Sequence, residues 1–386
     1  MEMLTKVMMQ LIKSELCGKL GDDLDRDALS DDFLSQLYSL AKSHDLAHIV
    51  GSALKNNGLL PKNEIGAKFE KQIFMAIFRY ESLNYEYASI CETLENEKIT
   101  FVPLKGSVIR KLYPLPWLRT SCDIDILVKE ADIDRTVSLL CEKLDYTADP
   151  KRHYHDVSLY SKNKIHLELH FNIFEGMDNI DPMLSRVFEF CSPADGKEFE
   201  LLQSPEYLLF HHIAHMSYHF LSGGCGIRPF IDMYLINNHL KYDEKSARQI
   251  LADCSLEKFF DGILNLTDVW FGNSAHTALT QNMENYILSG GVYGTKNNVI
   301  AMNNEKKGGK RKYLIHRIFM PYDSLKVKYP SLNGRRWLSP IYQIRRWFGL
   351  IFGGRMKHSL KELKVLQNID NEKAEALSDL LYKLEI

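Results

Sequence analysis

The heptapeptide Cys122-Asp123-Ile124-Asp125-Ile126-Leu127-Val128 alternates between two kinds of side chain. In an extended chain the apolar residues at even positions share one face, and the two aspartates share the other face with Leu127. This alternation predicts a half-buried β-strand with both carboxylates leaving the same face. Two anions a few ångströms apart repel each other and raise each other's pKa, so a fold rarely keeps such a pair together without a cation.

A second alternating stretch lies downstream, from Lys164 to Phe171. Its apolar residues form one face, and His166, Glu168 and His170 form the other. Together with a strand at 157–160 and a tight turn at 161–163, it predicts a β-hairpin. Glu168 can therefore add a third carboxylate to the aspartate pair. Three acids on one sheet face suit a two-metal site for Mg²⁺ or Mn²⁺, which prefer oxygen ligands.

The segment before the aspartates has the features of a phosphate-binding turn. Leu104-Lys105-Gly106-Ser107 follows a short β-like run at 99–104 and opens a predicted helix at 106–112. Glycine lets the backbone approach a ligand closely, and a helix N-terminus offers N–H groups and a positive dipole end to phosphate. Ser107 can add a hydroxyl, and Lys105 or Arg119 can add a cation.

Helical periodicity dominates on both sides of this unit. The clearest stripe runs from Phe69 to Leu94, and we interpret it as a helix packed on its own domain rather than a partner surface. Ser204-Pro205-Glu206 predicts a capped helix start, whereas 289–309, rich in Gly, Asn and Lys, predicts a loop. The chain therefore divides into an N-terminal helical region (1–98), a small mixed-sheet core (99–202) and a C-terminal helical region (203–386). This is an α/β (α+β) fold.

Several runs resemble the uncharacterised bacterial nucleotidyltransferase family, which belongs to the DNA polymerase β-like superfamily. The similar residues are Leu104-Lys105-Gly106, Tyr113-Pro114, Arg119, Asp123 to Val128, Leu167 to His170, Ser204 to Glu206, the His211–His219 helix and Gly226 to Asp232. The resemblance implies metal-dependent transfer of a nucleoside monophosphate from an NTP, with ATP as the expected donor, to a hydroxyl-bearing small molecule or protein. It also implies that Gly106 and Ser107 hold phosphate, that Asp123 and Asp125 bind metal, and that Glu168 is the third carboxylate.

Two features depart from the family's pattern. The third acid is Glu168 where Asp is more usual, and a Tyr-Pro-Leu-Pro-Trp segment lengthens the spacing between Gly106-Ser107 and Asp123. The chief alternative function is therefore a non-catalytic nucleotide-binding or interaction module on the same scaffold.

The histidines leave further alternatives open. His166, Glu168 and His170 could form a zinc or iron site of a metallohydrolase, although adjacent same-face residues converge poorly on one ion. His170 is more plausible as a residue that orients or contacts the acceptor. His211, His215 and His219 share one helix face, where hydrogen-bonded histidines are preferred over a zinc site. Arg228 and Asp232, one turn apart, could touch substrate or form an intrahelical ion pair.

Composition excludes several classes of protein. The 386 residues include 48 basic and 50 acidic side chains, so a net charge of −2 offers no global field for coating nucleic acid. Seven scattered cysteines without a C-x-x-C pair favour a reducing cytoplasm, and no apolar run is long enough to predict a transmembrane helix. Basic groups at 306–312 and 335–346 could bind nucleic acid, and 347–352 could contact a membrane, but a solvated basic face is the simpler interpretation.

Overall fold

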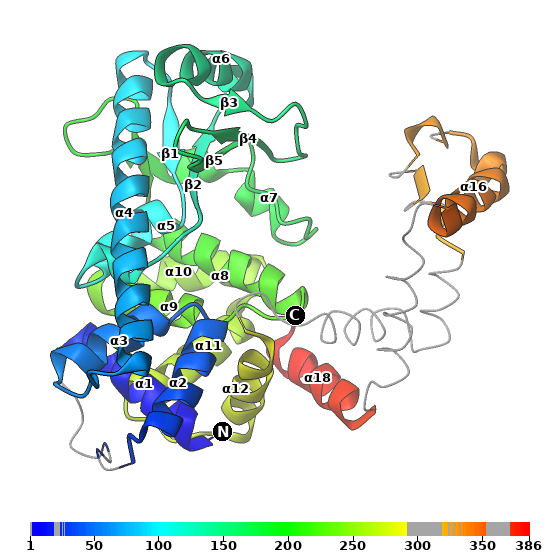
Figure 1. Ribbon diagram of the computed structural model, residues 1–386. Coiled ribbons are helices and arrows are strands. Elements are labelled where there is room, and N and C mark those ends of the chain that lie inside the picture. Colours follow the sequence, from blue (N-terminus) through cyan, green and yellow to red (C-terminus); the bar gives the residue numbers. More distant parts are fainter. Residues whose placement is uncertain are drawn as a thin grey trace.

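The computed structural model describes residues 2–18, 24, 26, 28–291, 319–322, 325–326, 329–332, 334–352 and 371–386 (Figure 1). The basic group at 306–312, most of the loop predicted for 289–309 and the side chains at 349–352 lie outside the described residues. Within the described part of the chain, no helix combines the length and the hydrophobicity needed to cross a membrane.

A five-stranded mixed sheet forms the centre of the α+β fold. Its strands, in spatial order, are β1 (Phe101–Pro103), β2 (Asp123–Val128), β5 (His166–His170), β4 (Asp156–Tyr160) and β3 (Thr147–Ala148). β2 and β5 run parallel and the other neighbours run antiparallel, with Asp125 opposite Glu168. The predicted strands and the predicted hairpin are therefore confirmed, while β3 is a strand that the sequence pattern did not indicate.

The two faces of the sheet have different roles. Ile124, Ile126 and Leu169 point to one side and form a core with α4 (Glu64–Asn96) and α6 (Ile133–Leu144). Because side chains alternate along a strand, the aspartates and Glu168 point to the other side. That side lies over α8 (Pro205–Leu221), which begins with the predicted Ser204 cap: the Ser204 side chain accepts from the N–H of Tyr207.

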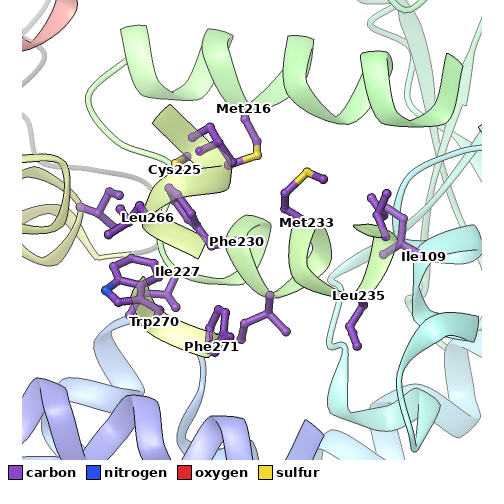
Figure 2. Close-up of a cluster of buried hydrophobic side chains, with 14 of the residues drawn as sticks. Ile109, Met216, Cys225, Ile227, Phe230, Met233, Leu235, Leu266, Trp270 and Phe271 are labelled. Atoms are coloured by element: carbon purple, nitrogen blue, oxygen red, sulfur yellow. The ribbon is translucent and has the colours of Figure 1, made fainter. Parts of the chain in front are cut away.

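The remaining helices build one larger core that joins both ends of the chain. Its helices are α1 (Glu2–Cys17), α2 (Asp31–Ser43), α3 (Ala47–Asn56), α8, α9 (Arg228–His239), α10 (Glu244–Asp253), α11 (Glu257–Phe271), α12 (Ala278–Gly290) and α18 (Asn371–Leu384). Phe230 and Trp270 pack edge to face near its centre, with ring centroids 4.9 Å apart (Figure 2). Lys13 of α1 donates to the carbonyl of Gly272, at the end of α11, over 2.8 Å. The first and third predicted regions thus share a core, and the three-region boundaries stay a prediction.

The described part of the chain contains further helices and strands. They are α5 (Gly106–Ile109), α7 (Asp181–Leu184), the two-stranded sheet of β6 (Cys191–Pro193) and β7 (Leu201–Gln203), and α16 (Ser339–Phe352). A single carboxylate, that of Glu95 on α4, accepts hydrogen bonds from the backbone N–H groups of residues 198–200 just before β7. This contact fastens the small sheet to the long helix.

Candidate active site

A cavity of about 460 Å³ lies between the polar face of the sheet, α8, the start of α9 and α4. Eight of the predicted site residues line it: Lys105, Gly106, Arg119, Asp123, Asp125, Glu168, Arg228 and Asp232. Ser107 and His170 are buried and are not among the lining residues. The fold therefore brings together, around one hollow, residues that are up to 127 positions apart, as between Lys105 and Asp232.

Carboxylates and histidines alternate on the sheet side of the cavity. His170 Nε2 donates to Asp125 Oδ1 over 3.0 Å and lies 3.5 Å from Glu168 Oε2. Two sets of donor atoms lie within 4.8 Å of one another among the described residues, Asp123–His166–Glu168 and Asp125–Glu168–His170. The alternative zinc set of His166, Glu168 and His170 does not form such a group, because the two rings lie on opposite sides of Glu168 and bind different partners.

The two aspartates differ in electrostatics. Burial, together with the charges of Asp125 and Glu168, raises the pKa of Asp123 to about 6. For Asp125, burial acts in the same direction, but Lys105 and the hydrogen bond from His170 outweigh it and hold its pKa well below the ordinary value. Lys105 Nζ lies 3.5 Å from Asp125 Oδ1, whereas no cation pairs with Asp123 in the described part of the chain. Asp123 is therefore the carboxylate whose charge is not compensated.

Arg119, one of the two cations predicted to bind phosphate, already has a carboxylate partner. Its Nε and Nη2 donate to the two oxygens of Asp232 over 2.9 and 2.8 Å, and Tyr113 Oη donates to Asp232 Oδ1 over 2.8 Å. Burial opposes the charge of Asp232, but Arg119 outweighs it and lowers the pKa of this carboxyl. Arg228 instead pairs with Asp45, so the alternative of an intrahelical Arg228–Asp232 pair is wrong.

In the predicted phosphate-binding turn, the first N–H groups of the helix already have backbone partners. The N–H groups of Ser107 and Val108 donate to the carbonyls of Leu104 and Lys105. A Cβ on Gly106 would lie 2.6 Å from Arg119 Nη1. Gly106 therefore makes room for the Arg119 guanidinium, a role that its position in the turn did not indicate.

Sequence reasoning missed Arg79, which reaches the cavity from α4. Its Nη1 lies 3.6 Å from Cys122 Sγ, one residue before Asp123. Of the four lysine and arginine side chains that line the cavity, it alone has no carboxylate within ion-pair distance among the described residues. Only the tertiary fold brings residue 79 next to residue 122, so no local pattern could have revealed it.

A second residue that sequence reasoning missed is Glu175, which pairs with His215. His215 Nδ1 donates to Glu175 Oε1 over 2.7 Å, and His219 Nε2 lies 3.0 Å from His215 Nε2. Burial, with the nearby charge of Lys105, lowers the pKa of His215 well below its ordinary value, so the ring is neutral. With the proton on Nδ1, its Nε2 accepts from His219. The expectation of hydrogen-bonded histidines on α8 is met, with a carboxylate partner that helical spacing did not show.

An Asp-x-Asp strand, a third acid on the parallel neighbouring strand and a glycine turn around one cavity form the layout of a nucleotidyltransferase. A family model described as "Uncharacterised nucleotidyltransferase" matches residues 33–272, more than half of the chain, and the protein belongs to that family. Membership supports a general nucleotidyltransferase function. No curated protein and no solved structure shows significant similarity to the chain.

Proposed function

We propose that the protein is a metal-dependent nucleotidyltransferase that moves a nucleoside monophosphate from an NTP to a hydroxyl-bearing acceptor. The observation that carries the proposal is the convergence of Asp123, Asp125 and Glu168, from two parallel strands, on one cavity. ATP as the donor and a cytoplasmic location stay predictions from the sequence.

The residues on the sheet fit a divalent cation. Asp123 and Glu168 offer carboxylate oxygens, which Mg²⁺ and Mn²⁺ prefer. The raised pKa of Asp123 shows that its negative charge is destabilised, so a cation bound beside it would be stabilising. Asp125 would join them once Lys105 turns toward a phosphate. When bound there, the metal supplies neutralisation of the triphosphate charge and polarisation of the acceptor hydroxyl.

Arg79 and Lys105 are the side chains best placed to bind the phosphates. Among the described residues, the Arg79 guanidinium has no carboxylate partner, and guanidinium groups bind phosphate through paired hydrogen bonds. Arg119 has a supporting role. Its bidentate pair with Asp232 fixes the position of the guanidinium against which Gly106 packs.

In the transfer step the acceptor oxygen forms a bond to the α-phosphorus as the bond to the β-phosphate oxygen breaks and pyrophosphate leaves. Glu168 takes the proton of the acceptor hydroxyl at its carboxylate. The buried ring of His170 holds Glu168 and Asp125 in position through its Nε2.

Glu168→Gln tests this assignment. With Mg²⁺ and each labelled NTP, the variant should lose pyrophosphate release while calorimetry shows nearly unchanged NTP binding, because the aspartates remain. His166→Ala is the matched control and should be mild. If wild-type protein binds NTP but the nucleotide is never transferred, the non-catalytic module is the correct function. Stoichiometric zinc that disappears in His166→Ala would instead establish the metallohydrolase.

A further inference from the structure

A second hollow, of about 660 Å³, lies beside the cavity, between α4 and the turn that joins β4 to β5. Met75, Phe78 and Tyr85 of α4 line one side of it, and Asn163 and Ile165 line the other. We call this hollow the α4 groove. Arg79 lines both the α4 groove and the cavity, so the groove leads to the candidate active site at this residue.

The α4 side of the groove is unusually apolar for a surface. Phe78 is 60% exposed, Tyr85 71% and Met75 43%. Elsewhere on the same helix large side chains such as Phe69 and Leu83 are buried, so α4 is held in the fold by another face. Large exposed apolar side chains gathered along one groove mark a surface that binds another molecule. Because Arg79 lines both hollows, a molecule bound in the groove can extend past this residue into the cavity and react there.

The dimensions favour an extended chain over a small molecule. Met75 to Tyr85 covers roughly 15 Å along the helix axis, at about 1.5 Å per residue, which matches about five residues of an extended peptide. Between the apolar side chains the groove also offers oxygen atoms of Ser82, Glu81 and Asn163, which can accept hydrogen bonds from backbone N–H groups of a peptide. A sugar or another small acceptor would need only the space beside the nucleotide in the cavity and would leave the α4 groove unused.

We infer that the acceptor is a polypeptide, with apolar side chains in the α4 groove and a Ser, Thr or Tyr hydroxyl in the cavity beyond Arg79. The inference rests on the proposed function and specifies its acceptor class. The side-chain oxygen of the peptide forms the new bond to the α-phosphorus. The bond between the α-phosphorus and the β-phosphate oxygen breaks, pyrophosphate leaves, and the hydroxyl proton passes to Glu168. The product is a nucleotidylated side chain.

The test uses the full chain with Mg²⁺ and α-labelled NTPs. The probe is an array of peptides with one central Ser, Thr or Tyr, flanked either by Leu and Phe or by Asp, Lys and Gly. A panel of sugars and amino alcohols runs in parallel. Wild-type protein should label apolar-flanked peptides at least about tenfold more than polar-flanked ones, since burying one or two apolar side chains contributes that much affinity.

The variant Phe78→Ser/Tyr85→Ser removes two rings of the groove without touching the carboxylates. Labelling of apolar-flanked peptides should fall about tenfold or more, while NTP binding by calorimetry stays unchanged. Tyr382→Ser is the matched control, because Tyr382 is 83% exposed on α18, away from the groove. It should label peptides as wild type does.

Four results would overturn the inference: equal labelling of both peptide groups, labelling of small molecules alone, no transfer to any peptide by a protein that binds NTP, or an unaffected double variant. A dimer in light scattering that the double variant abolishes would assign the groove to a second copy of this chain. Failure of the wild type to bind any NTP would be a different result, because it would refute the proposed function itself.

Discussion

At the scale of single residues, Asp123 and Asp125 are the same amino acid on the same strand face, but their surroundings differ. Lys105 and His170 both contact Asp125 Oδ1, whereas Asp123 has burial and two neighbouring anions around it. Strand alternation alone predicts that amidation of either residue relieves repulsion and leaves the thermal midpoint unchanged or higher. The structure separates the two cases.

Asp123→Asn should raise the free energy of unfolding of the metal-free protein by about 1 kcal/mol, since it removes an uncompensated charge. Asp125→Asn should lower it by about 3 kcal/mol, because Lys105 and His170 lose their buried anion. Both variants should lose NTP turnover. Thermal unfolding without and with Mg²⁺ measures the difference, and shifts of the same sign would contradict it.

Arg79 gives a second prediction at this scale. Arg79→Met should weaken NTP and pyrophosphate binding by about 10- to 100-fold, the range expected for charge-assisted hydrogen bonds, and should leave nucleoside monophosphate binding nearly unchanged. Lys71→Met is the matched control: it removes one positive charge from the same helix outside the cavity. Calorimetry with all three ligands measures these affinities. Equal losses of affinity in both variants would show that any positive charge on α4 strengthens binding, without a specific contact from Arg79.

The site residues that lie on strands could be predicted from the alternation of side chains along those strands. Asp123, Asp125 and Glu168 line the cavity together because a period of two places them on one face of adjacent strands. Arg79 and Glu175 were not predictable, because they reach the cavity and its lining residue His215 from a helix and a loop whose positions depend on tertiary packing. The sequence placed Arg119 and Asp232 in the site but did not show that they pair with each other.

At the scale of elements, the turn from β1 into α5 depends on Gly106. Gly106→Ala would place a methyl group 2.6 Å from Arg119 Nη1, and Arg119 is held by Asp232 and cannot easily move. We expect a loss of about 1–3 kcal/mol in the free energy of unfolding, the usual range for overpacking. Urea denaturation measures it. A variant as stable as wild type would show that Arg119 shifts freely.

Long or strongly patterned elements and the short strand β1 were predicted correctly, whereas β3, β6 and β7 were not. α4, α6, α8, β2 and the β4–β5 hairpin all correspond to clear periodicity. β3 has two residues, and β6 and β7 have three each, so all three are shorter than the run of about four alternating residues from which a strand can be recognised. Their places are set by pairing with β4 and with each other.

At the scale of the whole molecule, buried neutral histidines make stability depend on pH. Burial lowers the pKa of His48 on α3 from 6.5 to about 4, and its Nε2 donates to the carbonyl of Leu118. The unfolded chain therefore binds a proton below about pH 6.5 that the folded chain does not bind until about pH 4, so this contribution to stability is lost as the pH falls through that window.

His48→Gln keeps a donor for Leu118 and cannot titrate. Between about pH 7 and about pH 5, the wild type should lose about 2 kcal/mol more stability than the variant. Urea titrations at both values measure this difference. His239→Gln, at an exposed histidine, is the control and should behave as wild type. Equal pH dependence in all three proteins would show that His48 takes up its proton in the folded state.

The union of the first and third regions in one core also determines how the chain folds during synthesis. Lys13 meets Gly272, 259 positions later, and at about 5–20 residues per second roughly ten to fifty seconds separate their emergence from the ribosome. α1 and α3 can pair early, but the apolar surface that awaits α11 stays open to other nascent chains throughout that interval. Cellular yield should therefore respond to chaperone supply and to translation speed more than the equilibrium stability alone would suggest.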